Sequence, residues 1–267
     1  MVDSTPIVDV SKLFSLAGKT AIVTGGTGGL GAAMTTALAS AGADIVSIEI
    51  PEDPASQTIK DAVEKTGRKI RQYTCNVREP KALREVYQKL WSEGIKGDVL
   101  LNCAGVQRRA EAEDFTDEDI DFVLDINLKA TMVSCQEFAK PLLKEGRPGK
   151  IINIASIISF IGGKNITPYA ASKGGVMQLT KAFSNEWAEE GIQVNSIHPG
   201  YFRTPLTTQY STDPKYEKFN DYIMSRTPAK RWGEPVDLSG AVIFLASAAS
   251  DYVSGTGIVV DGGFTGM

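Results

Sequence analysis

The sequence predicts an α/β fold in which a doubly wound parallel sheet forms a single domain. Short β-branched runs alternate with longer helical patterns along the chain, which is typical of parallel strands joined by right-handed helical crossovers. A length of 267 residues, 42% of them hydrophobic, suits one large domain with a full core. A glycine-rich turn after the first apolar run is a third indication, because it makes a tight connection between a strand and a helix.

About seven strands are expected, with helices on both faces of the sheet. The strands are predicted near Thr20, Asp44, Ile70, Val99, Ile151, Val194 and Ile258. Helices are expected over 32–41, 117–144 and 168–190, and glycines at 42 and 191 close the first and the last of these. Pro168 suits the first turn of its helix, where its missing N–H costs nothing.

Two segments fall outside this alternation. Residues 1–18 precede the first strand and are expected to form a leader packed on or near the domain, which spans 19–267. The polar stretch 206–231 contains Tyr and Pro and interrupts the pattern of strands and helices. We interpret 206–231 as a helical lid over the substrate, because lids that exclude water come from such insertions.

The glycine-rich turn points to a dinucleotide. It has the sequence Thr24-Gly25-Gly26-Thr27-Gly28-Gly29-Leu30-Gly31 and lies between an apolar strand and a helix of small residues. Glycines let the backbone approach a pyrophosphate, whose charge then lies at the positive end of the helix. The turn therefore predicts a Rossmann-type domain.

An acidic residue after the second strand bears on the choice of dinucleotide. Glu49 follows Gly31 by eighteen residues, about where an acid binds the ribose 2′-hydroxyl and repels a 2′-phosphate. No Arg or Lys lies between Thr20 and Lys60 to receive such a phosphate. NAD is therefore favoured over NADP, although Glu49 could also be a solvated carboxylate at a strand end.

Three further residues predict a proton donor. Ser156 follows a buried-looking strand, and Tyr169 and Lys173 share one helical face one turn apart. An ammonium at that spacing is expected to lower the pKa of the phenol toward neutral pH. Tyr169 would exchange a proton with a carbonyl or alcohol oxygen, and Ser156 would hydrogen-bond the same oxygen. The alternative is that Tyr169 is a packed core residue.

With these motifs, the chain resembles the short-chain dehydrogenase/reductase family over nearly its whole length. Residues 24–31 match the family's TGxxxGxG turn, residues 102–105 its NNAG element, and 199–200 with Thr204 the segment that closes over the nicotinamide. Cys103 replaces the second Asn of NNAG, and Asn76 stands where many relatives have Asp near the adenine.

The resemblance implies roles for individual residues and an assembly. It makes Asn127, Ser156, Tyr169 and Lys173 a catalytic tetrad, in which Asn127 holds a water that links Lys173 to solvent and Lys173 also holds the ribose hydroxyls. It implies a homotetramer built from the helices that carry Asn127 and Tyr169 and from the C-terminal segment. Motifs and resemblance together give the expected cofactor-binding residues Gly25, Thr27, Gly28, Gly29, Leu30, Gly31, Glu49, Asn76, Val77, Asn102, Ala104, Gly105, Tyr169, Lys173, Pro199, Gly200, Phe202 and Thr204.

The substrate is expected to be a sugar acid. The stretch 149–163, the helix after it and 226–232 are most similar to the family's branch of 2-dehydro-3-deoxy-D-gluconate (2-deoxy-D-gluconate 3-) dehydrogenases and gluconate 5-dehydrogenases. Two arginines follow the fourth strand, where ligands of open α/β sheets bind, and a guanidinium there could hold a carboxylate with two parallel hydrogen bonds. The expected substrate contacts are Arg108, Arg109, Ser156, Tyr169 and Tyr201.

Other functions stay open at this point. The arginines could be solvated loop residues, and the enzyme could reduce neutral or bulky ketones of the ketoacyl or cyclic type. A nucleotide-binding module without turnover is disfavoured by the intact catalytic set. Arg109 is a better candidate than Arg108 for the selective contact, because Arg108 aligns with similar residues in family members that act on other substrates.

Composition excludes several classes of partner. A net charge of −4 argues against nucleic acid. Cys75, Cys103 and Cys135 follow neither a metal-ligand nor a paired spacing and suit a reducing compartment. His198, the sole histidine, is expected to be structural, and no metal is predicted. Without a signal peptide, membrane span or lipidation ending, the expected location is cytoplasmic.

Overall fold

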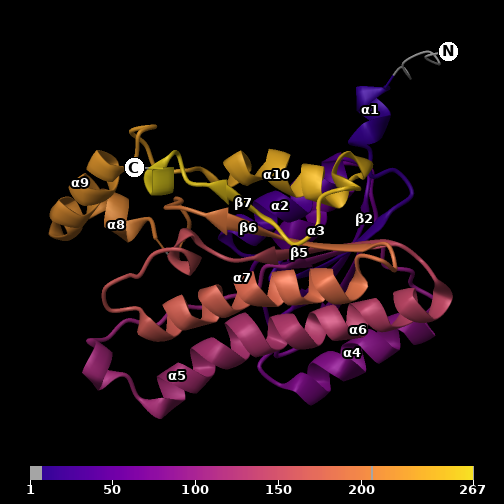
Figure 1. The fold of residues 1–267 in the computed structure, drawn as a ribbon, viewed down its shortest axis with the longest axis horizontal. Coiled ribbons are helices and arrows are strands. Elements are labelled where there is room, and N and C mark those ends of the chain that lie inside the picture. Colours follow the sequence, from indigo (N-terminus) through magenta and orange to yellow (C-terminus); the bar gives the residue numbers. More distant parts are fainter. Residues whose placement is uncertain (1–7, 206, 267) are drawn as a thin grey trace.

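The computed structural model describes residues 8–205 and 207–266 and contains a seven-stranded, all-parallel sheet. The strand order is β3-β2-β1-β4-β5-β6-β7 (Figure 1). The strands are β1 (Thr20–Thr24), β2 (Asp44–Glu49), β3 (Ile70–Thr74), β4 (Val99–Asn102), β5 (Gly149–Ile154), β6 (Ile192–Pro199) and β7 (Gly257–Val260). The predicted single α/β domain of the Rossmann type, with helices on both faces, is confirmed.

The order of the strands reverses between the two central strands β1 and β4. The chain runs outward from β1 to β3 on one side and from β4 to β7 on the other, so β1 and β4 mark the point where the direction reverses. Thr24 pairs with Asn102, so these two strands end side by side. Ligands of open α/β sheets bind at this reversal, beyond the carboxyl ends of the strands.

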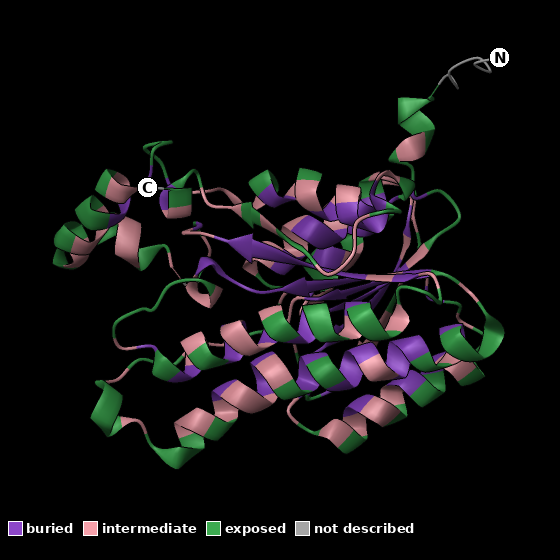
Figure 2. Ribbon diagram, in the orientation of Figure 1, coloured by how far each residue is buried: buried purple, intermediate pink, exposed green. Residues whose placement is uncertain are grey.

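Helices cover both faces of the sheet and bury its central strands (Figures 1 and 2). One face carries α2 (Gly29–Ser40), α3 (Ser56–Glu64) and α10 (Ser239–Ala246), and the other carries α4 (Pro80–Ser92), α5 (Asp117–Leu124), α6 (Ala130–Glu145) and α7 (Thr167–Trp187). Strand β4 is buried at every position, as expected of a near-continuous apolar run covered on both sides. Among the described residues, no helix combines the length and apolar character needed to cross a bilayer.

One predicted helix is interrupted in the structure. The range 117–144 was expected to be a single helix, but a π-helical turn over Asp125–Lys129 separates α5 from α6. Asn127 lies at the middle of this turn. A π-helical turn inserts one extra residue and re-aims the side chains around it, and such turns are frequent at functional sites.

The expected leader and the expected lid are less regular than the rest of the chain. In the expected leader, residues 1–7 lie outside the described residues, helix α1 (Val10–Leu13) has no buried residue, and Leu16 is buried. In the expected lid, Leu206 lies outside the described residues, and α8 (Gln209–Thr212) and α9 (Glu217–Arg226) follow it. Figure 1 shows α8 and α9 at the end of the sheet to which the strand arrows point. Ile223 of α9 packs with Trp232 and Phe264 in a small core of its own.

Candidate active site

The glycine-rich turn is packed so closely that side chains are excluded from it. A Cβ atom on Gly25 would lie 2.6 Å from the backbone nitrogen of Ala104, and one on Gly31 would lie 2.0 Å from the carbonyl oxygen of Gly25. Gly25 also has a φ of +67°, which favours glycine. A Cβ on Gly29 would lie 3.1 Å from the Cβ of Thr204. The glycine-rich turn, the loop after β4 and the segment around Thr204, all expected at the cofactor, therefore lie against one another.

The start of helix α2 has free backbone donors. Its N-cap, Gly28, has no side chain that could accept a hydrogen bond from the first amides of the helix. The N–H groups and the helix dipole both favour an anion at this end. An open backbone cradle beside an uncapped helix start fits the pyrophosphate of a dinucleotide.

The carboxylate of Glu49 is buried, so it is not the solvated strand-end group considered above. Glu49 is 3% exposed. Its Oε2 accepts a hydrogen bond of 2.5 Å from Ser56 Oγ, and its Oε1 accepts one of 3.1 Å from Gln72 Nε2. These contacts fix the carboxylate at the end of β2, beside the start of α3.

A second carboxylate, which the sequence analysis missed, lies against the glycine-rich turn. Asp53 Oδ2 accepts a hydrogen bond of 2.6 Å from Thr27 Oγ1. Asp53 stands in the loop after β2, four residues beyond Glu49, and nothing in its local sequence marks it as part of the site. Two carboxylates therefore lie between the end of β2 and the start of α3, and one of them is bonded to the glycine-rich turn.

Ser156 and Tyr169 are brought together beyond β5. Ser156 caps a short 3₁₀ turn, and its Oγ accepts a hydrogen bond of 3.1 Å from Ile158 N. Burial raises the pKa of the Tyr169 phenol above its ordinary value, and the hydrogen bond with Ser156 opposes part of this effect. The phenol is therefore protonated at neutral pH, as a proton donor must be.

Lys173 lies one turn further along α7 and is buried. Its Nζ donates a hydrogen bond of 2.7 Å to the carbonyl oxygen of Ile154 and lies 5.8 Å from the ring centroid of Tyr169. Burial lowers the pKa of the Lys173 ammonium to about 8. The pKa of Tyr169 was expected to be lowered toward neutral pH, but in this structure burial raises it.

Asn127 joins the π-helical turn to two other elements. Its Nδ2 donates to the carbonyl oxygen of Val106 and to Ser172 Oγ, each at 3.0 Å. Its Oδ1 accepts a hydrogen bond of 2.8 Å from Val106 N. The side chain thus ties the loop after β4 to α7, next to Lys173. The water implied by the resemblance stays a prediction.

Some expected cofactor residues direct their side chains elsewhere. Asn102 Nδ2 donates to Asn153 Oδ1 at 2.9 Å and to Cys135 Sγ at 3.3 Å, so this amide lies between the sheet and α6. Phe202 is 4% exposed and packs in the main core. Asn76 Oδ1 accepts a hydrogen bond from Arg78 N. Any cofactor contact of Asn102 or Phe202 must therefore use the backbone.

The remaining cofactor candidates lie at or after strand ends, except Leu30, which lies in α2. Pro199 ends β6, and Gly200 after it is so close to Asp261 that a Cβ would lie 2.7 Å from the Cβ of that residue. Val77 follows β3 and is buried, Leu30 packs on the main core, and Gly105 lies beside Lys173, where a Cβ would be 3.6 Å from Nζ.

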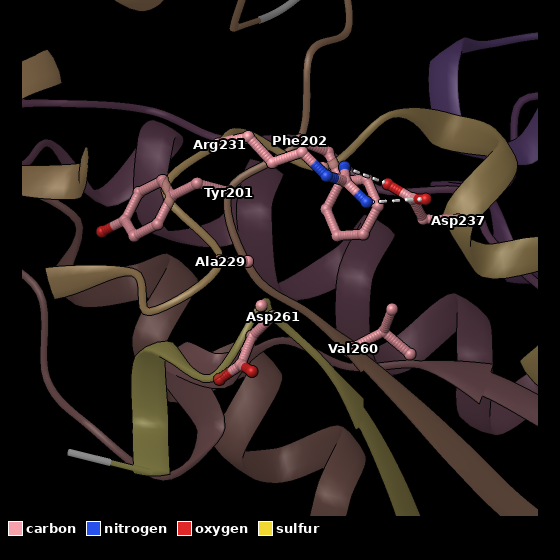
Figure 3. Close-up of a pocket in the computed structure, with 9 residues that line it drawn as sticks. Tyr201, Phe202, Ala229, Arg231, Asp237, Val260 and Asp261 are labelled. Atoms are coloured by element: carbon pink, nitrogen blue, oxygen red, sulfur yellow. Dashed lines mark hydrogen bonds and ion pairs between the residues drawn. The ribbon is translucent and has the colours of Figure 1, made fainter.

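A cavity of about 110 Å³ lies behind the segment after β6 (Figure 3). In Figure 3, Tyr201 and Phe202 point in opposite directions, and Arg231 is paired with Asp237. Asp261 Oδ2 accepts hydrogen bonds from Thr265, and its Oδ1 accepts one from Gly263 N. The charged groups that line this cavity are thus already paired, and Tyr201 packs against the small core around Ile223.

The two arginines after β4 point in different directions. Arg108 lies over the ring of Phe122 at 4.2 Å, and its Nε is 3.3 Å from Asp119 Oδ1, so α5 holds it. Arg109 instead lies over the rings of Tyr210 and Phe219, with its guanidinium carbon 5.2 Å and 6.0 Å from their centroids.

Tyr201 lies near both Arg109 and Tyr169. Burial raises the pKa of the Tyr201 phenol, the charge of Arg109 acts to lower it, and the nearby Tyr169 acts to raise it. The ring of Tyr201 also meets Phe219 edge to face, with centroids 6.0 Å apart. Arg109, Tyr201 and Tyr169 therefore share one region, whereas Arg108 is turned away from it.

This combination of fold and site defines an NAD(P)-dependent oxidoreductase that acts on alcohols and carbonyl groups. A family model described as enoyl-(acyl carrier protein) reductase matches residues 25–265. The chain belongs to the short-chain dehydrogenase/reductase family.

Similar proteins include several enzymes of sugar acids. The chain is 44% identical to a 2-dehydro-3-deoxy-D-gluconate 5-dehydrogenase of Escherichia coli over 96% of this chain and 98% of that protein. It is 37% identical to a gluconate 5-dehydrogenase of Gluconobacter oxydans over 95% of this chain and 97% of that protein. The crystal structure of a gluconate 5-dehydrogenase from Burkholderia cenocepacia, in complex with NADP and tartrate, superposes with a TM-score of 0.90 at 37% identity and covers 97% of this chain and 100% of that one.

Proposed function

We propose that this protein transfers a hydride between NAD(H) and a secondary alcohol or ketone of a sugar acid, of the 2-keto-3-deoxygluconate or gluconate type. The observation that carries the substrate class is the position of Arg109. Its guanidinium lies against Tyr210 and Phe219 in the same region as Tyr201 and Tyr169. A planar guanidinium held by aromatic rings keeps its fork of donors for a carboxylate.

In this proposal, the chain's own residues move the proton while the bound nicotinamide supplies or accepts the hydride. The Tyr169 phenol, kept protonated by burial, donates its proton to the carbonyl oxygen as that oxygen gains negative charge. Ser156 Oγ already accepts from Ile158 N, so its own hydrogen is available for the same oxygen. The ammonium of Lys173, about one helical turn from the phenol, stabilises the phenolate that remains.

The segment 206–231 is assigned the role of a lid in this reaction. Its described part presents Tyr210 and Phe219 to Arg109 and packs through Ile223 on Trp232 and Phe264. The same cluster contains Ile157 of the turn that Ser156 caps, so the lid packs directly against the segment that carries Ser156. Closing it over the substrate would exclude water from the reacting atoms.

NAD is the proposed cofactor, because carboxylates near the glycine-rich turn would repel the 2′-phosphate of NADP. Glu49 is buried and hydrogen-bonded at the end of β2, and Asp53 is bonded to Thr27 of the glycine-rich turn. The gluconate 5-dehydrogenase of Burkholderia cenocepacia has NADP bound, so both cofactors belong in every assay.

A homotetramer in the cytoplasm is proposed as the working form. Exposed apolar side chains on α6, Met132 at 38% and Leu143 at 37%, lie on one of the helices that the family resemblance assigns to subunit contacts. The three cysteines are free in the described structure, which suits a reducing compartment. Sedimentation equilibrium would measure the mass of the assembly.

An activity screen tests the substrate and the cofactor together. Aldonates and ketoaldonates are compared with neutral and bulky ketones, each with NAD and with NADP, by NADH or NADPH absorbance. The sugar-acid proposal requires a higher kcat/KM for the acids. A higher kcat/KM for the neutral ketones would favour the ketone-reductase alternative. The absence of turnover with every substrate would favour a nucleotide-binding module without catalytic activity.

A further inference from the structure

Ser156 stands where the chain has just left the sheet. The ladder between β5 and β6 pairs Ile154 with Ile197, and Ala155 N then donates a hydrogen bond of 2.9 Å to the carbonyl oxygen of Ile197. Beyond that bond, β-ladder pairing no longer fixes the backbone of the catalytic serine. A donor that must point at a reacting oxygen needs some other support, because small displacements reduce the rate.

His198 of β6 reaches across to this serine. Its Nδ1 lies 3.0 Å from the carbonyl oxygen of Ser156, and its Nε2 lies 2.8 Å from Ser196 Oγ. A carbonyl oxygen can only accept, so Nδ1 carries the hydrogen, and in the neutral ring Nε2 then accepts from the Ser196 hydroxyl. Both nitrogens are therefore used, and the ring has one tautomer.

The ring of His198 is locked from its other sides as well. It is 1% exposed and stacks on Phe160, with centroids 4.5 Å apart. On β7, a Cβ atom at Gly257 would lie 2.3 Å from Nε2, so a glycine there leaves the space that the ring fills. Burial lowers the pKa of His198, which keeps the ring neutral near pH 7.

We propose that His198 is a positioning residue for the catalytic serine: by donating to the Ser156 carbonyl, it holds the backbone that aims the Ser156 hydroxyl at the reacting oxygen. The carbonyl of Ser156 accepts a second hydrogen bond of 2.9 Å from Ser159 N, so the imidazole clamps the turn that Ser156 caps. His198 itself is assigned no contact with substrate or cofactor. The inference rests on the reaction proposed above but not on the class of substrate.

Two amide substitutions separate positioning from packing. In His198→Asn, the side-chain nitrogen can take the place of Nδ1 and donate to the Ser156 carbonyl. In His198→Gln, the nitrogen reaches the place of Nε2 instead, toward Ser196, and the bond to Ser156 is lost. Both variants are polar and similar in size, which makes them a matched pair. Ser184→Ala is the control, because it removes a buried hydroxyl on α7 that is bonded to Ser254 Oγ at 2.7 Å.

The experiment uses the full-length enzyme with the best substrate of the screen and measures kcat, KM, the Kd for NADH and the melting temperature. His198→Gln is expected to lower kcat about tenfold, because the transition state loses the stabilisation of about one hydrogen bond. The KM and the Kd for NADH should change less than about twofold. His198→Asn is expected to restore most of kcat, and Ser184→Ala to leave it unchanged.

A double-mutant cycle with Ser156→Ala decides whether the effect passes through the serine. If His198 acts only through Ser156, adding His198→Gln to Ser156→Ala costs little further rate. The same tenfold loss in both backgrounds would overturn the proposal, and so would equal kcat values in His198→Asn and His198→Gln. Because NADH binding and melting are measured independently of the substrate, failure of the sugar-acid proposal would be recognised separately.

Discussion

The Nζ atom of Lys173 donates a hydrogen bond of 2.7 Å to the carbonyl oxygen of Ile154. Ile154 is the last residue of β5, two residues before Ser156, so this bond ties α7 to the strand end that leads to Ser156. The ammonium is buried at the same time, and burial lowers its pKa to about 8. The group is charged at neutral pH, but it titrates within the range in which the enzyme can be assayed.

The first prediction concerns pH. The proposed reduction uses a protonated Tyr169 and a charged Lys173, and Lys173 is charged below its pKa of about 8 and neutral above it. The kcat/KM for reduction should therefore fall as pH rises through about 8, as measured from about pH 6 to about pH 10. A profile that stays flat until Lys173 reaches its ordinary pKa of about 10.4 would contradict this assignment.

The second prediction concerns the proton donor. Tyr169→Phe removes the phenolic proton and keeps the ring, so NADH binding by fluorescence titration should be retained. Turnover should fall by roughly 10² to 10⁴, the usual contribution of general acid–base catalysis. Ser156→Ala should also lower the rate more than it weakens NADH binding. If Tyr169→Phe kept more than about a tenth of kcat, only ~1.4 kcal/mol of barrier, another group would be the acid.

Much of the fold and of the site could be predicted from the sequence, because the signals are local. Continuous apolar runs mark β1 and β4, and glycines at 25 and 31 are required by contacts within the turn and with Ala104. The family motifs also brought together Ser156, Tyr169 and Lys173. A short motif with its spacing is enough to predict such features.

The rest depends on tertiary contacts that no local pattern contains. The side chain of Asn127, in the π-helical turn, bonds to Val106 and Ser172, which lie far from it in the sequence. The inward turn of Asn102 depends on partners on β5 and α6. Arg108 and Arg109 are adjacent in the sequence, and only the positions of α5 and of the lid separate their roles.

The third prediction concerns the cofactor. The native enzyme should have a higher kcat/KM with NAD than with NADP, because Glu49 and Asp53 oppose a 2′-phosphate. Glu49→Ser combined with Ile50→Arg should shift kcat/KM toward NADP by more than about tenfold. Ile50 is 57% exposed, so an arginine fits there without disturbing the core.

Ile50→Arg alone is the matched control for the cofactor prediction. It adds the cation but keeps both carboxylates, so its shift toward NADP should be smaller than that of the double variant. Equal efficiency of the wild-type enzyme with NAD and NADP would remove Glu49 from the ribose role.

The fourth prediction concerns the substrate carboxylate. Arg109→Ala should raise KM for an aldonate and leave that for a neutral ketone almost unchanged. Loss of a charge-assisted hydrogen bond costs roughly 1.5 to 3 kcal/mol, or about 10-fold to 150-fold in affinity. Arg108→Ala is the control, because Arg108 is held by Asp119 and Phe122 and should change KM for the aldonate by less than about threefold.

Arg109 also contacts the lid, so the experiment must separate recognition of the acid from support of the lid. Its guanidinium lies over Tyr210 and Phe219, and removing it also removes those contacts. Loss of lid support would reduce kcat/KM for acids and neutral ketones alike, whereas loss of a carboxylate contact affects only the acids. Arg109→Lys keeps the charge without the planar fork and should fall between the wild type and Arg109→Ala on aldonates. Equal losses on both classes of substrate would mean that Arg109 orders the lid and recognises no carboxylate.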